Sequence, residues 1–384
     1  MKSILENKAY LYLICLFLGI ITSFSLPPYN FVFLNFLSLP TLLYILINYT
    51  HKKIISFFVG WVFGFGYFIS NLYWITNSLT FDVNFKLIIP FALILIPLFL
   101  GIFYGLVTFL SSLFNLKNKL SSVLIFSIFF GGIEFLRSFI LGGFPWNLLV
   151  FSVSNNLPSL QILSYVGTYS LNLLSITIFL LPIIFFNKYK SSAAVIFFCF
   201  GLILVVINYS YGYFNIKNFE KKKYDKLDSV IRVVSPKVPI ERFLTNQSPE
   251  KNIDELLTLS DPNKSEKKIF IFPEGIITSI YFRDLKFFKN IFKKKFNANH
   301  KVILGINSIK ENKIYNSLVV LNSDTELLYK YNKNKLVPFG EFLPFENFFK
   351  RVGLKKITQG YQSFSADNKR EILKIDKLKF IPLI

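Results

Sequence analysis

Seven long apolar stretches before residue 214 limit what this chain can fold into. A helix needs about 20 apolar residues to cross the roughly 30 Å hydrocarbon core of a bilayer, and every stretch is close to that length or longer. The predicted membrane helices cover residues 8–26, 31–49, 54–78, 87–114, 120–141, 159–186 and 191–213. We therefore expect residues 1–213 to form an all-α membrane domain of about seven transmembrane helices.

The first of these stretches has a second interpretation, a cleaved signal peptide. A signal peptide ends in a cleavage site of small residues. The sequence SFSLPP, which follows the first apolar stretch, offers no such site. We therefore expect this stretch to remain in the protein as its first helix.

The lysines between the apolar stretches predict how the chain is oriented. Basic residues in short loops resist translocation, whereas long polar domains cross a membrane largely regardless of charge. Lysines precede the first stretch and occupy every second loop after it, at Lys2, Lys8, Lys52, Lys53, Lys117, Lys119, Lys188 and Lys190. Seven spans that start from a cytoplasmic N-terminus place residues 214–384 on the opposite, non-cytoplasmic side of the membrane. We expect a multi-pass protein of the bacterial inner membrane with a periplasmic C-terminal domain.

The formal net charge of +21 raises the question of nucleic acid binding. The basic residues form no stripe with interleaved aromatic residues, which a nucleic-acid-binding surface would need. Lysine is frequent throughout the chain, and attraction to anionic lipid headgroups is the simpler use of the charge. The membrane is therefore an expected partner, and nucleic acid is not.

Two polar features stand out in the predicted membrane domain. Glu134 and Arg137 are three residues apart on one predicted helix, so they can face each other and lower the cost of burial in lipid. A helix-packing ion pair is the simpler reading of this pair. The uncharged segment 142–158 contains Trp146, which suits either a loop that contacts lipid or an interfacial anchor.

Residues 214–384 have a different pattern, with short β-branched runs that alternate with polar helical stretches. The predicted strands are 230–235, 268–273, 301–306, 315–321, 326–331, 371–375 and 378–384, and the predicted helices are 250–260 and 281–297. Apolar strands between helices indicate a sheet that is covered on its faces. The second domain, 214–384, is therefore predicted to be an α/β or α+β sandwich.

Cysteine and histidine give no sign of a metal or redox site. Cys15 and Cys199 both lie in predicted membrane helices and are read as small hydrophobic residues. His51 and His300 stand alone, without the spacing of a metal site. We expect neither a metal nor a cofactor.

Three polar residues of the second domain are candidates for a site. Glu274 directly follows the apolar strand IFIFP, and the carboxyl ends of strands are where open α/β sheets place ligand groups. A partly desolvated carboxylate there can act as a general base, although a surface loop glutamate fits the sequence equally well. Lys333 and Glu341 lie in YNKNKLVPFGEFLP, where prolines fix a tight loop. Spacing alone does not distinguish Lys333 from its neighbours Lys330 and Lys335.

These motifs resemble those of a known family. FPEG at 272–275 followed by YNKNKLVPFGEFLP at 331–344 resembles the carbon–nitrogen hydrolase (nitrilase) superfamily. In addition, GFGYFISNLYWI at 64–75, GGIEFLRSFILGGFPWN at 131–147 and VSPKVPIERF at 234–243 are similar to stretches of the apolipoprotein N-acyltransferase family. The resemblance extends over nearly the whole chain.

The resemblance implies a fold and a reaction. It implies a nitrilase-like α-β-β-α sandwich, and an enzyme that moves a phospholipid acyl chain to the N-terminal amine of diacylglyceryl-cysteine in an apolipoprotein. Glu274 would be the general base, Lys333 would stabilise the oxyanion, and Glu341 would support them. The family also needs a nucleophilic cysteine, which would fall just after Ile384, and an eighth membrane helix. On this reading the chain is truncated, its sandwich is incomplete at the C-terminus, and it is inactive alone.

Two alternatives stay open. In a split enzyme, a separate C-terminal fragment would supply the cysteine and the last helix, and it would co-purify with this chain. A non-catalytic membrane protein that binds lipid or lipoprotein would instead tolerate Glu274→Gln and Lys333→Ala. A transporter is disfavoured because the chain shows no sign of inverted repeats.

Overall fold

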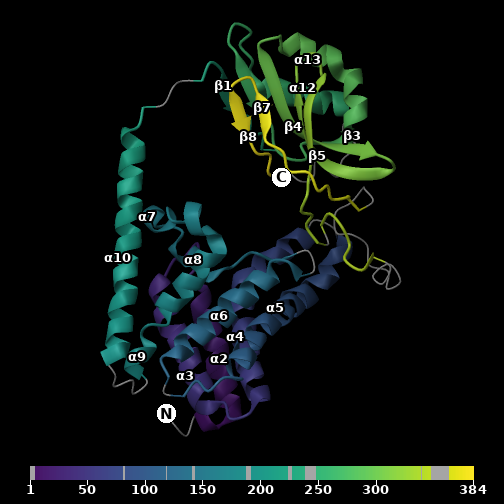
Figure 1. Ribbon diagram of the computed structural model, residues 1–384. Coiled ribbons are helices and arrows are strands. Elements are labelled where there is room, and N and C mark those ends of the chain that lie inside the picture. The colour runs from purple at the N-terminus through teal and green to yellow at the C-terminus, as the bar shows by residue number, and fades with distance from the viewer. Residues whose placement is uncertain are drawn as a thin grey trace. The chain divides into compact units, whose positions relative to one another are not determined.

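The chain divides into two compact units, Met1–Lys223 (unit 1) and Tyr224–Ile384 (unit 2). Unit 1 is helical, and unit 2 is built on a mixed β-sheet (Figure 1). The structure, a computed structural model, describes residues 5–80, 83–117, 119–140, 143–186, 192–223, 227–237, 248–338, 340–346 and 363–384. Part of the quoted motif at 234–243 lies outside these residues.

Long apolar helices make up unit 1. The α-helices are α2 (Lys8–Ser23), α3 (Asn35–Tyr49), α4 (Lys53–Leu72), α5 (Ile89–Ser111), α6 (Ser121–Arg137), α7 (Leu157–Leu160), α8 (Leu163–Phe179), α9 (Ile183–Phe186) and α10 (Ser192–Lys221). The 3₁₀ segments are η1 (Val32–Leu34), η2 (Tyr73–Leu79), η3 (Val83–Ile88) and η5 (Leu149–Val153). A helical segment is therefore found within each predicted stretch.

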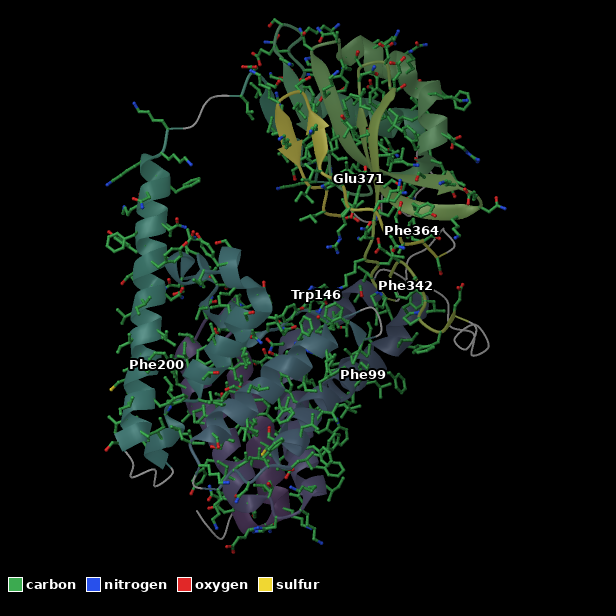
Figure 2. The ribbon with its side chains drawn as sticks, viewed as in Figure 1. Phe99, Trp146, Phe200, Phe342, Phe364 and Glu371 are labelled. Atoms are coloured by element: carbon green, nitrogen blue, oxygen red, sulfur yellow. The ribbon has the colours of Figure 1, made fainter. Side chains whose placement is uncertain are left out.

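Five helical segments in the described residues are long and apolar enough to cross a membrane. They are Val32–Tyr49, Lys53–Leu79, Phe85–Ser111, Leu163–Phe185 and Ser192–Lys221. Large apolar side chains on their outer surfaces are exposed, as for Phe99 of α5 and Phe200 of α10 (Figure 2). The remaining helices are shorter, with 16 residues in α2 and 17 in α6. Five spans are thus supported, and the full set of seven stays a prediction.

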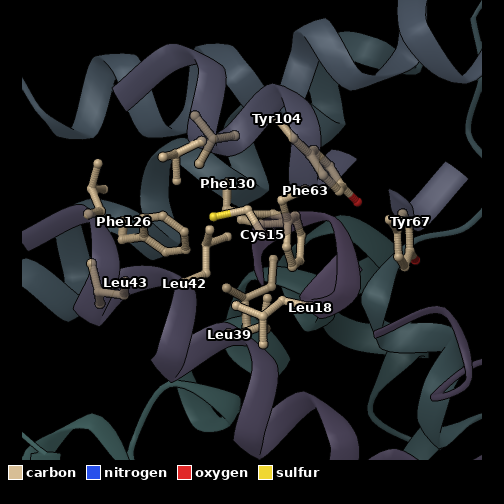
Figure 3. Close-up of a cluster of buried hydrophobic side chains, with 14 of the residues drawn as sticks. Cys15, Leu18, Leu39, Leu42, Leu43, Phe63, Tyr67, Tyr104, Phe126 and Phe130 are labelled. Atoms are coloured by element: carbon tan, nitrogen blue, oxygen red, sulfur yellow. The ribbon is translucent and has the colours of Figure 1, made fainter. Parts of the chain in front are cut away.

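Glycines allow the central helices of unit 1 to approach closely. A Cβ atom at Gly64 of α4 would lie 2.8 Å from the Cα atom of Gly101 in α5, and one at Gly60 would overlap the carbonyl oxygen of Tyr104. Around these contacts, buried leucine and phenylalanine side chains enclose Cys15 (Figure 3). Small residues at such crossings are how membrane helices gain van der Waals contact, since lipid offers no hydrophobic driving force between them.

The predicted pairing of Glu134 with Arg137 is confirmed. The Arg137 Nη2 atom lies 3.6 Å from Glu134 Oε1, and both side chains are fully buried. The rings of Phe68 and Phe144 flank the guanidinium at 5.2 and 5.5 Å. Glu134 also accepts a 2.8 Å hydrogen bond from the hydroxyl of Tyr104. The pair therefore joins α6 to its neighbours inside the bundle.

A six-stranded sheet organises unit 2. Its order is β1-β2-β4-β5-β6, with β3 paired to β4. Strands β1, β2, β3 and β4 pair in parallel, whereas β5 is antiparallel to both of its neighbours, β4 and β6. The strands are β1 (Val230–Val233), β2 (Lys268–Ile271), β3 (Ile277–Tyr281), β4 (His300–Lys310), β5 (Lys313–Leu321), β6 (Leu327–Asn332), β7 (Leu373–Ile375) and β8 (Leu378–Phe380). Strands β7 and β8 form a separate antiparallel hairpin.

The two faces of the main sheet are covered differently (Figure 1). Helices α12 (Pro249–Ser260) and α13 (Lys289–Lys295), with η6 (Phe282–Phe288), pack on one face against side chains such as Phe270 and Val302. The β7–β8 hairpin packs on the other face, against Ile303 and Val320. A second helix layer is not found among the described residues of unit 2, so the nitrilase-like four-layer sandwich stays a prediction.

The secondary structure corrects the sequence-based predictions at three places. Strand β3 was not predicted, because ITSIY follows β2 after only a short turn and pairs with β4 in a shifted register. The predicted helix 281–297 is a 3₁₀ segment followed by the short α13. The predicted last strand, 378–384, ends at Phe380, and Pro382 beyond it has no N–H group to donate to a ladder.

Candidate active site

Glu274 lies in a turn directly after β2, as the sequence predicts. Its neighbour Gly275 has a φ of +59°, a left-handed conformation that glycine adopts without a Cβ clash. The turn passes close to Gly305 of β4, where a Cβ atom would lie 2.7 Å from the Glu274 Cα atom. The absence of a side chain at Gly305 therefore lets β4 run beside the Glu274 turn.

Lys333 directly follows β6 and continues its ladder with β5. The Lys333 N–H donates a 2.8 Å hydrogen bond to the carbonyl oxygen of Asn316, and the Lys333 carbonyl accepts one of 3.1 Å from Asp367. Side chains alternate along a strand, and Lys333 falls on the sheet face that carries the hairpin. The ladder thereby fixes the direction in which the lysine side chain leaves the backbone.

The loop after Lys333 holds Glu341 by reciprocal hydrogen bonds. The N–H of Val337 donates to Glu341 Oε2 at 2.8 Å, and the N–H of Glu341 donates to the Val337 carbonyl at 2.8 Å. The Glu341 carbonyl accepts a further 2.8 Å hydrogen bond from the N–H of Phe364. One carboxylate oxygen is thus used by the loop, which leaves Oε1 to face the lysine.

The three predicted site residues come together. The Lys333 ammonium lies 3.0 Å from Glu274 Oε1 and 3.1 Å from Glu341 Oε1. Glu274 and Lys333 are 59 positions apart in sequence, so only the fold joins them. Charged hydrogen bonds of this length are stronger than neutral ones.

Asn316 of β5 is a site residue that the sequence analysis missed. Its Nδ2 group donates to Glu274 Oε1 at 2.6 Å and to Glu341 Oε1 at 3.0 Å. It therefore binds the same two carboxylate oxygens as Lys333 does. The available signal was an asparagine within the otherwise β-forming run YNSLVVL, which is an unusual place for that residue.

The charges of the cluster do not cancel. One ammonium group faces two carboxylates, and the side chains of Lys333 and Glu341 are only 11% and 14% exposed, against 42% for Glu274. Burial lowers the pKa of Lys333, but the hydrogen bond that Lys333 donates to Glu274 and the charge of Glu341 more than offset burial, so the pKa is raised above its ordinary value. The site thus presents a fixed cation and one solvent-accessible carboxylate.

We expect a titration of Lys333 to show directly that the two carboxylates raise its pKa more than burial lowers it. In protein whose lysines are ¹³C-methylated, the Lys333 resonance, assigned with Lys333→Arg, should titrate above the ordinary lysine pKa of about 10.4. In Glu274→Gln/Glu341→Gln, burial acts unopposed and the Lys333 pKa should fall below that value. The exposed Glu371→Gln is the control and should change nothing. If the Lys333 pKa is the same in the double variant as in the unaltered protein, the two carboxylates do not interact with Lys333 as the structure shows.

Comparison with known proteins finds matches to one family. Residues 18–181 match the family model of the apolipoprotein N-acyltransferase N-terminal domain. The apolipoprotein N-acyltransferases of Rhizobium rhizogenes and Rickettsia prowazekii are 27% and 28% identical to the chain, and each match covers 97% of it. That of Brucella melitensis is 25% identical over 95% of the chain. The chain is thus similar to apolipoprotein N-acyltransferases over nearly its whole length, and its residues 18–181 match the N-terminal domain of that family.

The matches to these apolipoprotein N-acyltransferases span both units of the chain. They cover 73%, 74% and 72% of the Rhizobium rhizogenes, Rickettsia prowazekii and Brucella melitensis proteins. About a quarter of each relative therefore lies outside the matched stretch. The resemblance that the motifs indicated is confirmed at the level of the family.

The two cysteines of the chain belong to unit 1, whereas the cluster belongs to unit 2. Cys15 is buried in α2 and Cys199 is exposed on α10, so both belong to unit 1. His300, in unit 2, is buried and used structurally, since its ring nitrogens contact the Asn263 carbonyl and the Asn297 N–H. Among the residues that the structure describes, no three metal-binding side chains gather.

Proposed function

We propose that this protein is a membrane N-acyltransferase that moves an acyl chain from a phospholipid to the α-amine of diacylglyceryl-cysteine in an apolipoprotein. The observation that carries the proposal is the cluster in which Lys333 lies between the carboxylates of Glu274 and Glu341. The names of the relatives support the reaction class. The apolar helices of unit 1 support a membrane location, where both lipid substrates reside.

The proposed chemistry is a two-step exchange through a thioester. Glu274, the most exposed of the three side chains, takes the proton of a thiol, and the thiolate attacks the ester carbonyl of a phospholipid. Lys333 stabilises the oxyanion that forms at that carbonyl. Glu274 then returns the proton to the departing lysophospholipid. Glu341, with Asn316, holds the lysine in place.

In the second step Glu274 and Lys333 keep these roles. The α-amine of diacylglyceryl-cysteine attacks the thioester carbonyl, whose oxyanion again faces Lys333. Glu274 accepts the proton that the amine loses, and the thiolate leaves when the amide forms. In this proposal the reaction is of the Glu-Lys-Cys type and needs no metal or cofactor.

The thiol of this reaction is proposed to come from outside residues 1–384. The sequence has two cysteines, and both are in helices of unit 1. A cysteine in a further segment, or in a separate C-terminal fragment, would complete the cluster. Residues 1–384 by themselves should therefore bind substrates without forming an acyl-enzyme.

The proposal also includes the topology and fold that the sequence predicts. Helices α2 and α6 complete seven spans of the inner membrane, the N-terminus is cytoplasmic, and unit 2 folds as part of a nitrilase-like sandwich in the periplasm. The alternation of lysines between the loops supports this orientation. In this arrangement unit 2 works on the outer leaflet.

Mass spectrometry of a diacylglyceryl-cysteine peptide tests the reaction. Residues 1–384 are co-expressed with the part of the Rickettsia prowazekii relative that lies outside the match, and membranes receive a phospholipid with isotope-labelled acyl chains. We expect the labelled chain on the peptide amine, and none when residues 1–384 act alone. Cys15→Ser/Cys199→Ser is the control and should retain the activity. Labelled product from residues 1–384 that carry both serines and lack the co-expressed segment would contradict the need for an added thiol.

A further inference from the structure

A second polar cluster lies behind the candidate active site, on the opposite face of the same strands. Side chains alternate along a strand, so Asn316 and Lys333 leave one face of the sheet, and their chain neighbours Ser317 and Asn332 leave the other. The Ser317 hydroxyl donates a 2.8 Å hydrogen bond to Asn332 Oδ1, across the strand pair. The hydroxyl of Ser308 in β4 lies 2.7 Å from that of Ser317. We use the name rear stack for Ser308, Ser317 and Asn332.

Asp367 completes the rear stack from a segment that follows the strands in sequence. The Asn332 Nδ2 group donates a 2.7 Å hydrogen bond to Asp367 Oδ2. Asp367 Oδ1 accepts hydrogen bonds from the N–H groups of Asn368 and Lys369 at 2.8 and 3.4 Å. The bond from Asn332 lowers the pKa of Asp367, and these N–H groups add to the effect, so the pKa lies below its ordinary value although burial raises it. Asp367 is therefore an ionised acceptor that uses both carboxylate oxygens.

The segment that carries Asp367 is bound along its backbone to the elements that hold the site. We use the name strap for residues 364–367. Three N–H groups of the strap donate hydrogen bonds to carbonyl oxygens on three different elements. These bonds run from Phe364 to Glu341 at 2.8 Å, from Ser365 to Ile314 of β5 at 2.7 Å, and from Asp367 to Lys333 at 3.1 Å. The strap therefore joins the loop of Glu341 to β5 and to the end of β6.

The register of β6 against β5 decides on which face of the sheet Lys333 lies. Strand β6 is the last in the strand order, and its pairing with β5 is irregular at one point. A slip by one residue moves every side chain of a strand to the other face, so it would turn Lys333 away from Glu274. The bonds of Asn332 to the buried Ser317 and to Asp367 oppose such a slip, because polar groups that lose their partners on burial are costly.

We propose that Asp367 is a positioning residue that holds the Lys333 ammonium between Glu274 and Glu341, acting through Asn332 and through the Lys333 carbonyl. The inference rests on the acyl transfer proposed above, in which Lys333 faces the oxyanion. The Lys333 ammonium binds Glu274 and Glu341, whereas Asp367 binds the Lys333 backbone. Asp367 therefore sets where the ammonium lies and takes no part in the chemistry itself.

An exchange of the two side chains tests the proposal. Asn332→Asp places a second carboxylate against Asp367, and the repulsion between them should release the strap from β6. Asn332→Asp/Asp367→Asn again provides one carboxylate and one amide, with their places exchanged. The carboxylate at position 332 can accept from Ser317 and from the amide at position 367, whose oxygen can still accept from the N–H groups that follow it. The double variant should therefore rebuild the hydrogen bonds that the single variant breaks.

The pKa of Lys333, measured by titration of ¹³C-methylated lysines, separates positioning from a simple effect of charge. By charge alone, the carboxylate that Asn332→Asp adds beside Lys333 would raise the pKa of the ammonium. Release of the strap instead moves the ammonium away from Glu274 and Glu341. We therefore expect Asn332→Asp to lower the Lys333 pKa and Asn332→Asp/Asp367→Asn to restore it.

Initial rates of N-acylation give the second measurement. With the co-expressed segment, Asn332→Asp should reduce the rate by about 10²-fold, as expected when a catalytic group is displaced by about 1 Å. Asn332→Asp/Asp367→Asn should recover most of the rate. Asn322→Asp is the matched control, because Asn322 donates a 2.7 Å hydrogen bond to Glu326 in the turn between β5 and β6. It adds the same charge next to a carboxylate and should change neither the rate nor the Lys333 pKa.

The two measurements distinguish a failure of this inference from a failure of the proposed reaction. A Lys333 pKa that rises or stays the same in Asn332→Asp would overturn the positioning role, and so would a double variant that keeps the lowered pKa. An Asn332→Asp protein with the rate of the unaltered one would overturn it as well. If even the unaltered protein forms no product while the Lys333 pKa changes as expected, the acyl-transfer proposal fails and the hold of Asp367 on Lys333 is supported.

Discussion

Lys333→Ala is expected to reduce N-acylation of the peptide by at least about 10²-fold to 10³-fold, the loss that follows removal of one oxyanion donor in other acyl-transfer enzymes. The substitution removes the cation that we propose to face the oxyanion. It also leaves Glu274 and Glu341 without the ammonium that lies 3.0 and 3.1 Å from them. The fold-reduction is measured by comparing the initial rates of labelled-product formation of Lys333→Ala and the unaltered protein, each co-expressed with the added segment.

Two controls separate chemistry from folding in this experiment. Lys335→Ala removes a lysine two positions further along, whose side chain is exposed, and should keep nearly the full rate. Thermal unfolding of Lys333→Ala shows whether unit 2 still folds, because two carboxylates have lost their partner. A folded Lys333→Ala protein with the rate of the unaltered one would contradict the role proposed for Lys333.

The second large effect is expected in the helix bundle. Glu134→Leu leaves the buried guanidinium of Arg137 without its counter-ion, and removal of one partner of a buried pair costs about 3–5 kcal/mol. Within the described residues, the Arg137 nitrogens have no hydrogen bond of their own, so Glu134 and the two flanking rings are their main compensation. Unfolding in detergent by increasing SDS, followed by circular dichroism, measures the loss.

The double variant makes this prediction specific. Glu134→Leu/Arg137→Leu removes both charges and should recover much of the lost stability, because an apolar pair of similar size replaces the buried ions. Glu220→Leu, on α10, breaks an exposed pair with Lys217 at the same three-residue spacing and should leave stability nearly unchanged. Equal stability of Glu134→Leu and the unaltered protein would show that the buried pair contributes nothing.

The sequence predicted the elements of both units well, for physical reasons. A helix in lipid must be long and apolar, and this requirement marks the five long apolar helical segments of unit 1 in the sequence. The β-branched runs marked seven of the eight strands in the same way. Strand β3 was not predicted because its pairing with β4 depends on a register that only the folded sheet defines.

The site was predictable only in part. Glu274 follows a strand, so its position at a sheet edge could be expected from the sequence. Lys333 could not be chosen among three nearby lysines without the family resemblance, since the choice depends on which side chain leaves the strand toward Glu274. Asn316 was missed because a hydrogen-bonding role depends on distances, and its bonds to Glu274 and Glu341 connect residues 42 and 25 positions away.

The central claim is that Glu274 and Lys333 act together in one acyl-transfer site, and a double-variant comparison of N-acylation rates tests it most directly. Residues that act as a unit give losses that do not multiply. We predict that Glu274→Gln, Lys333→Ala and the double variant all lose the activity to a similar extent. A fully active Glu274→Gln protein, or a double variant whose loss is the product of the two single losses, would contradict the claim.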